Sequence, residues 1–133
     1  MTTKARLLLV DDHPDSLEVL SLILEQSNFE VVGTDNGKQA LRLTREEKFD
    51  AYILDSWLPD ISGLDLCRSI REFDSHTPIV FYSANALDSD IDEAIQGGAQ
   101  AYVVKPASGD EVIEAVCKVL DEKRNASAAA AAS

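Results

Sequence analysis

Short apolar runs alternate with amphipathic segments along most of the chain. The runs have the length of strands buried on both faces, whereas the segments between them carry apolar residues at helical spacing. The predicted strands cover residues 6–10, 30–34, 49–54, 79–82 and 101–104. Five strands alternating with five helices predict a single α/β domain, with a parallel sheet covered by helices on both faces.

Local signals mark the ends of several predicted helices. Pro14 is favoured in a first helical turn, and Asn36 suits an N-cap position. Asn28 and the pair Gly97-Gly98 suit left-handed stops. The side chains expected on buried helix faces are Leu17, Leu20, Ile23 and Leu24 in the first helix, Leu64, Cys67, Ile70 and Phe73 in the third, Ile91, Ala94 and Ile95 in the fourth, and Val112, Val116, Val119 and Leu120 in the last.

The last predicted helix opens at a capping box, formed by Ser108 with Glu111 three residues later. It should end near Lys123. Residues 125–133 are almost entirely Ala and Ser, without an amphipathic pattern. We interpret this tail as a frayed helical extension, a linker stub or a cloning scar.

Composition narrows the function classes. The chain has 133 residues, of which 45% are hydrophobic, enough for one domain with a real core. It carries 24 acidic and 12 basic side chains, and the net charge of −12 argues against direct binding of nucleic acid. No apolar stretch approaches the roughly 20 residues of a membrane span, and no signal peptide is visible. These features predict a cytoplasmic protein without membrane contact.

Polar side chains follow four of the five predicted strands. Asp11-Asp12 follows the first, Asp55 the third, Ser83 the fourth and Lys105 the fifth. Because parallel strands open their carboxyl ends on one edge, where open α/β sheets bind ligands, these groups should converge. Crowded carboxylates favour a bound cation, and their oxygens suit Mg²⁺. Asp55 could then act as a nucleophile toward phosphorus, with Lys105 and Ser83 holding phosphate oxygens.

These residues resemble the receiver domain of two-component response regulators, over about residues 6–123, so that residues 1–124 would form the domain and 125–133 its tail. The matching elements are Asp11-Asp12, Asp55 with the following Pro59 and Gly63, Ser83-Ala84, and Lys105-Pro106. The resemblance implies a flavodoxin-like, doubly wound sheet of strand order 2-1-3-4-5. It also implies that a histidine kinase or a histidine phosphotransfer protein phosphorylates Asp55.

The resemblance further implies a metal site and a switch. Mg²⁺, with Mn²⁺ as an alternative, would be held by Asp12, Asp55 and the backbone carbonyl of Trp57, and by Asp11 through water. Ser83 and Tyr102 would form the switch pair, which changes the surface of the fourth helix, fifth strand and fifth helix. Trp57 and Asn85 would modulate the rate of dephosphorylation.

The implied protein is a regulatory phosphoacceptor and not an enzyme, with weak self-catalysed phosphorylation and dephosphorylation. Its output would pass to a downstream protein or to a missing output domain, and dimerisation is compatible with the resemblance.

Other interpretations remain open from the residues alone. A haloacid dehalogenase-type phosphatase also uses a strand-end aspartate, but it needs a second acid where this chain has Trp57. A flavin-binding module of similar fold would meet repulsion between its phosphate and Asp11-Asp12. Asp11-Asp12 could also simply cap the first helix. His13 and His76 are expected to be exposed loop residues, and Cys67 and Cys117 small residues that are buried or partly buried.

Overall fold

The computed structural model describes residues 4–132, with side chains described to residue 126. Within these residues, five strands and five helices alternate, as the apolar pattern predicts. The elements are β1 (Arg6–Val10), α1 (Pro14–Gln26), β2 (Glu30–Thr34), α2 (Gly37–Glu46), β3 (Ala51–Leu54), α3 (Gly63–Arg71), β4 (Ile79–Ser83), α4 (Asp88–Gln96), β5 (Ala101–Val104) and α5 (Gly109–Ala132).

The five strands form one parallel sheet in the order β2-β1-β3-β4-β5. This is the predicted flavodoxin-like order, and the prediction is confirmed. β3 lies in the centre, and all four of its residues are buried, because helices cover both of its faces. A strand in that position carries no ionised group, and Asp55 follows directly at its end.

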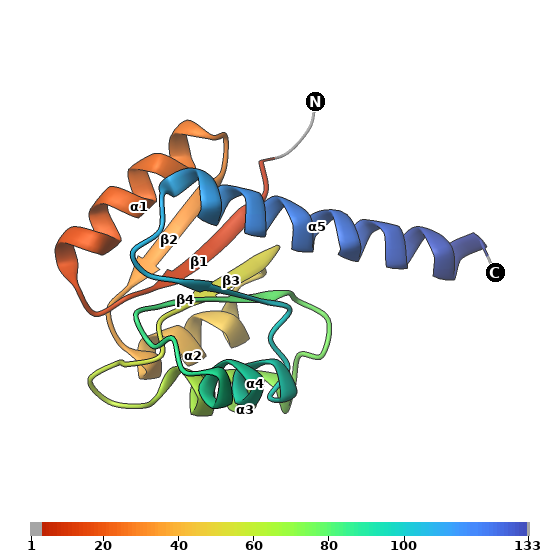
Figure 1. Cartoon of the computed structure of the whole chain (residues 1–133). Coiled ribbons are helices and arrows are strands. Elements are labelled where there is room, and N and C mark those ends of the chain that lie inside the picture. Colours follow the sequence, from red (N-terminus) through yellow and green to blue (C-terminus); the bar gives the residue numbers. More distant parts are fainter. Residues whose placement is uncertain (1–3, 133) are drawn as a thin grey trace.

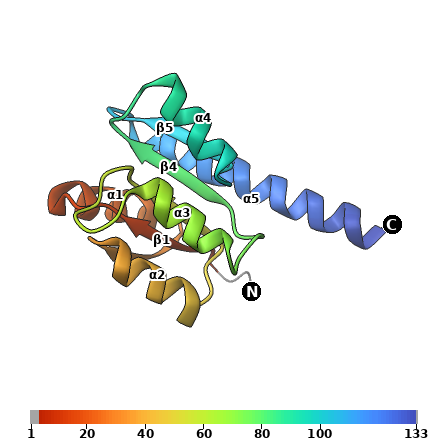
Figure 2. The same cartoon turned by 90° about the horizontal axis from the view of Figure 1, so that it is seen from below.

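Helices form one layer on each side of the sheet. α1 and α5 lie on one face and α2, α3 and α4 on the other (Figure 1), and the view from below shows the second group in front of the sheet (Figure 2). Because strand side chains alternate between faces, β1 contributes Leu7 and Leu9 to the core under α1 and α5, and Leu8 and Val10 to the core under the other helices.

The predicted helix signals are present in the structure. Pro14 opens α1, and the Asn36 side chain accepts a hydrogen bond from the Gln39 backbone N–H. Asn28 has the left-handed φ of 72° expected of a helix stop. At the start of α5, the Ser108 Oγ accepts from the Glu111 N–H at 3.2 Å.

The end of the last helix differs from the prediction. α5 does not end near Lys123 but continues to Ala132, in line with the helical extension that was one interpretation of the tail, and its last turns extend beyond the sheet (Figure 1). Alanine has the highest helix propensity, and the segment contains no Gly or Pro to stop the helix. Of the described helices, none is long and apolar enough to cross a membrane.

Three residues predicted to be buried or partly buried are exposed, namely Phe73, Ile95 and Cys117, and Leu17, Ile23, Leu64 and Ile91 are only partly buried. Ile95 is 45% exposed, because α4 buries only Ala94 fully. Phe73 lies beyond the end of α3 and is 43% exposed, with the Arg45 guanidinium 5.1 Å from its ring centroid. Cys117 is exposed, whereas Cys67 is buried as expected. The third helix buries Leu66 in addition to Cys67 and Ile70, whereas Leu64 is only partly buried.

Candidate functional site

Backbone hydrogen bonds hold the strand ends in register at one edge of the sheet. Val10 lies opposite Leu54, and the Asp55 N–H donates to the Val10 carbonyl at 3.0 Å. On the other side, Ser83 lies opposite Val104, and the Lys105 N–H donates to the Ser83 carbonyl at 2.8 Å. The sheet therefore fixes the backbone of Asp55, Ser83 and Lys105 at this edge.

Lys105 joins two of the three predicted acids. Its ammonium donates to Asp11 Oδ2 at 3.1 Å and to Asp55 Oδ2 at 3.3 Å. The side chains of Asp11 and Asp55 are 1% and 7% exposed, and that of Lys105 is 18% exposed. A charged carboxylate so deeply buried requires a paired charge, and Lys105 provides one charge for two carboxylates.

The third acid, Asp12, has a more exposed side chain, at 34%, and in the described part of the chain Lys105 forms no ion pair with it. Its Oδ1 is buried without a hydrogen bond, although His13 Nδ1 lies 3.0 Å away. Ligand atoms of Asp11, Asp12, His13 and Asp55 lie within 4.8 Å of one another. A buried oxygen without a donor beside two further carboxylates suits a hard divalent cation, so the residues present fit Mg²⁺.

Burial and charge shift the pKa values at this site. Burial raises the pKa of Asp55 above its usual range, a shift that Lys105 opposes and the nearby Asp11 reinforces. For Lys105, burial acts to lower the pKa, but hydrogen bonds and charges from Asp11 and Asp55 outweigh it and raise the pKa. The ammonium therefore stays charged, while the carboxylates favour a further cation.

The loop after β3 folds back tightly over Asp55. The Gly63 N–H donates to the Ser56 carbonyl at 2.8 Å, and a Cβ on Gly63 would lie 2.1 Å from the Asp55 carbonyl oxygen, so that only glycine fits. The Trp57 N–H points back to Asp55 Oδ1 at 3.3 Å, and the Trp57 side chain is 65% exposed at the rim.

Ser83 and Tyr102 lie on adjacent strands beside this site. Ser83 is fully buried, and its Oγ accepts from the Asn85 N–H at 3.1 Å. The Tyr102 ring stacks on Phe81 with centroids 5.6 Å apart, and its hydroxyl donates to the Asn85 carbonyl at 2.7 Å. Ser56 Oγ is also within reach of that hydroxyl, at 3.2 Å. The Tyr102 ring is thus turned toward the loops that follow β3 and β4.

The structure brings Asp11, Asp12, Asp55 and Lys105 together, as predicted. Between Ser83 and Asp55 no hydrogen bond occurs within the described part of the chain. His13 is exposed, as expected, yet it adjoins the acids. Sequence reasoning missed two contacts: the one between Ser56 and Tyr102, and the one between the Tyr82 ring and the Lys105 ammonium. Only alignment of strands β3, β4 and β5 could have indicated these two contacts.

Comparison with known proteins points to one family. Residues 7–117 match the family described as the response regulator receiver domain. The chain is 36% identical to the DNA-binding response regulator MtrA of Mycolicibacterium smegmatis, over 86% of this chain and 50% of MtrA. It is 34% identical to the chemotaxis protein CheY of Bacillus subtilis, over 87% of this chain and 98% of CheY. The chain thus spans about half the length of MtrA and nearly the whole of CheY.

Among solved structures, the receiver domain of a sensor histidine kinase from Pseudomonas aeruginosa PAO1 superposes with a TM-score of 0.82 and 28% identity. That match covers 89% of this chain and 98% of the solved chain, which has magnesium coordinated in its active-site cleft. The sheet order, the strand-end acids and the family match together define the class: this chain belongs to the response regulator receiver domain family. Its function class is phosphoacceptor signalling in a two-component system.

Proposed function

We propose that Asp55 accepts a phosphoryl group from a phosphohistidine of a histidine kinase or a histidine phosphotransfer protein. The observation that carries this proposal is the Asp55 carboxylate, nearly buried at the end of the central strand and paired with Lys105. In the transfer, an Asp55 Oδ forms a bond to phosphorus while the bond from phosphorus to the histidine nitrogen breaks, and the imidazole leaves with a proton. Lys105 then holds an oxygen of the transferred group.

Asp11, Asp12, Asp55 and the Trp57 carbonyl would hold Mg²⁺ or Mn²⁺, with Asp11 acting through water. When bound, the metal neutralises charge on the transferring phosphoryl oxygens. The unpartnered Asp12 Oδ1 supports a metal at this position, and so does the magnesium in the Pseudomonas receiver domain. Asp12 and Asp11 would thereby bring the donor phosphate toward Asp55 instead of repelling it.

Ser83 and Tyr102 would transmit the phosphorylation to the surface. The Ser83 hydroxyl, now accepting from Asn85, would turn toward the phosphoryl group and hydrogen-bond to it. The Tyr102 ring would then occupy the space that Ser83 vacates. Because Tyr102 belongs to β5 and contacts the loop before α4, its movement would change the surface of α4, β5 and α5.

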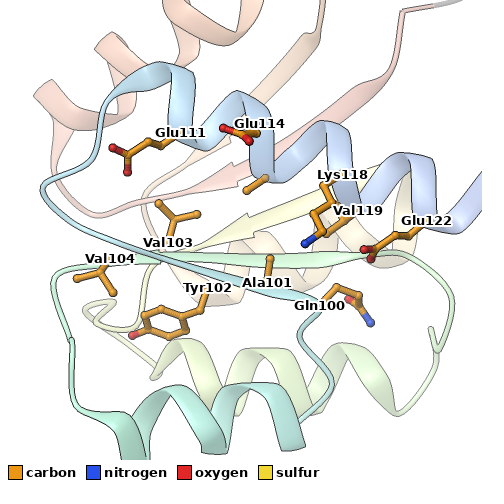
Figure 3. A pocket seen from close by; sticks show the side chains of 11 residues that line it. Gln100, Ala101, Tyr102, Val103, Val104, Glu111, Glu114, Lys118, Val119 and Glu122 are labelled. Atoms are coloured by element: carbon orange, nitrogen blue, oxygen red, sulfur yellow. The ribbon is translucent and has the colours of Figure 1, made fainter.

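A groove of about 490 Å³ between β5 and α5 forms part of that surface. Figure 3 shows Glu111, Glu114 and Glu122 projecting from α5 beside it, while Tyr102 points to the opposite side of β5. Because Tyr102 and the groove both belong to β5, a movement of Tyr102 would change the groove, and a downstream partner or an output domain that binds there would respond. Dimerisation through the same surface is a further route for the output.

The chain would act as a regulatory switch that phosphorylates and dephosphorylates itself only slowly. Trp57, exposed at the rim, and Asn85, whose backbone contacts both Ser83 and Tyr102, would set the rate at which water reaches the acyl phosphate.

Transfer from a phosphorylated protein tests the proposed donor. Histidine phosphotransfer proteins labelled on histidine should lose their phosphoryl group to this chain in Mg²⁺, and chelation should stop the loss. The variant Asp55→Asn should leave the label on histidine. Labelling by a small phosphodonor without transfer from any phosphohistidine protein would contradict the donor assignment.

A further inference from the structure

Tyr82 is an aromatic residue in β4 that touches the functional site from the side opposite Ser83. Adjacent strand residues point to opposite faces of the sheet, so Ser83 faces the core under α2, α3 and α4, and Tyr82 packs against the core under α1 and α5. Tyr82 is half-buried, beside a hollow of about 300 Å³ between α1 and the loop that precedes α5. The function described above gives this residue no role.

The Tyr82 side chain contacts the segment after β5 twice. The Lys105 ammonium lies 4.9 Å from the centroid of its ring, a separation typical of a cation–π interaction. Its hydroxyl donates to the Ala107 carbonyl at 3.3 Å. The Lys105 N–H meanwhile donates to the carbonyl of Ser83, the next residue of β4. Consecutive residues of one strand therefore hold both sides of the turn that carries Lys105.

We propose that Tyr82 is a positioning residue for Lys105: its ring holds the ammonium beside Asp11 and Asp55, and the long hydrogen bond from its hydroxyl to Ala107 adds only a weaker contact to the turn. This inference rests on the proposed role of Lys105. A lysine side chain has four rotatable bonds and little intrinsic preference for one direction. An aliphatic residue would fill the same volume but would not attract the cation.

The Tyr82 ring attracts the Lys105 ammonium in a way that does not depend on metal binding or phosphorylation, unlike the carboxylates. Asp11 and Asp55 now accept hydrogen bonds from Lys105, but both are also the proposed ligands of a metal, and Asp55 is the proposed acceptor of the phosphoryl group. Metal binding or phosphorylation would weaken their hold on Lys105, because their negative charge would then be shared. The neutral Tyr82 ring keeps its attraction in every one of these states, so the ammonium stays near the oxygen that it must bind.

Labelling rates with phosphoramidate in Mg²⁺ test the proposal. Tyr82→Leu removes the ring and should slow labelling by roughly 5-fold, whereas Tyr82→Phe retains the ring and should stay within about twofold of the parent. Phe49→Leu is the matched control, since it removes another core aromatic that faces a cation, Arg6, far from the site. That control should lower the melting temperature and leave the labelling rate unchanged.

A double-mutant cycle shows whether Tyr82 acts through Lys105. Lys105→Met should label much more slowly than the parent, and adding Tyr82→Leu to it should cause no further loss. A merely structural role of Tyr82 would produce the same loss in both backgrounds. The side-chain protons beside the Lys105 ammonium should also show an upfield ring-current shift, which disappears in Tyr82→Leu and remains in Tyr82→Phe.

The outcomes separate this inference from the proposed function. If Asp55→Asn and Lys105→Met label like the parent, the proposed function fails and takes this inference with it. Two outcomes would overturn only the positioning role, provided that Asp55→Asn and Lys105→Met are both impaired. In the first, Tyr82→Leu labels at the parental rate. In the second, Tyr82→Leu lowers the labelling rate by the same factor in the Lys105→Met background as in the parent. Absence of the ring-current shift in the parent would contradict it as well.

Discussion

Asp12 is the acidic residue at the site whose charge is least compensated. Lys105 bonds to Asp11 and Asp55, whereas the buried Asp12 Oδ1 has no hydrogen-bond partner. The three carboxylates repel one another, one ammonium does not neutralise them, and a bound metal would reduce this repulsion. At the scale of single residues, the acids that suit the proposed chemistry thus destabilise the metal-free fold.

Replacing Asp12 tests this balance. In chelator, Asp12→Ala should unfold at a higher temperature than the parent, by an amount corresponding to roughly 1 kcal/mol, because it removes an unpaired buried acceptor. Added Mg²⁺ should raise the melting temperature of the parent through linkage and that of the variant far less. Asp15→Ala, an exposed acid nearby, should respond to Mg²⁺ like the parent. Equal Mg²⁺ responses of Asp12→Ala and the parent would remove Asp12 from the metal site.

Trp57 gives a second prediction at this scale. Its backbone N–H contacts Asp55, and its indole is 65% exposed beside the proposed path of the attacking water. Trp57→Asn should shorten the lifetime of the phosphorylated protein severalfold, with phosphorylation by a good donor largely retained. The decay is followed by intact mass after removal of the donor. An unchanged or slower decay would show that the indole does not control water access.

Among the elements, the loop between α3 and β4 is held by one carboxylate. Asp74 Oδ1 accepts from the His76 and Thr77 N–H groups at 3.0 Å each, and its Oδ2 accepts from the Tyr52 hydroxyl at 2.8 Å. Partial burial acts to raise the pKa of Asp74, but these hydrogen bonds outweigh it and lower the pKa to about 2. The loop is thereby tied to β3, beside the start of β4.

The lowered pKa predicts the direction of a pH effect. A carboxyl whose pKa falls on folding stabilises the fold above its unfolded pKa of about 4, and this stabilisation is lost as the pH falls through the folded pKa. Because Asp74 is only partly buried, we expect its ionised carboxylate to stabilise the fold by about 1 kcal/mol. As the pH falls from 4 to 2, the free energy of unfolding should therefore decrease in both proteins, and the decrease should be larger in the parent than in Asp74→Asn by about 1 kcal/mol. Parallel pH profiles of the two proteins would contradict this account.

The elements were predictable from sequence to different degrees. Strands and the convergence of Asp11, Asp55 and Lys105 followed from apolar runs that end in polar residues, because parallel strands share one edge. The exposure of Ile95 was not predictable, because which side of a short helix is covered depends on the packing of its neighbours. The contact between Tyr82 and Lys105 depends on strand register, and a sequence does not show which side chains face each other across neighbouring strands.

At the scale of the whole molecule, α5 reaches beyond the domain. Its buried residues are Val112, Val116, Val119 and Leu120, all before the Ala-rich tail. Ending the chain after Arg124 should therefore lower the far-ultraviolet circular dichroism signal of helix while leaving the melting temperature unchanged. Ending it before Val119 should lower the melting temperature strongly, since that deletion opens the core. A destabilised Arg124 truncation would show that the tail packs on the domain.

The proposed function depends on Asp55, which follows the central strand, pairs with Lys105 and lies beside Asp11 and Asp12. Its most direct test is the intact mass of the protein after incubation with phosphoramidate and Mg²⁺. The parent should gain one phosphoryl group, and Asp55→Asn, or the parent in chelator, should gain essentially none. Equal labelling of Asp55→Asn and the parent would contradict the central claim.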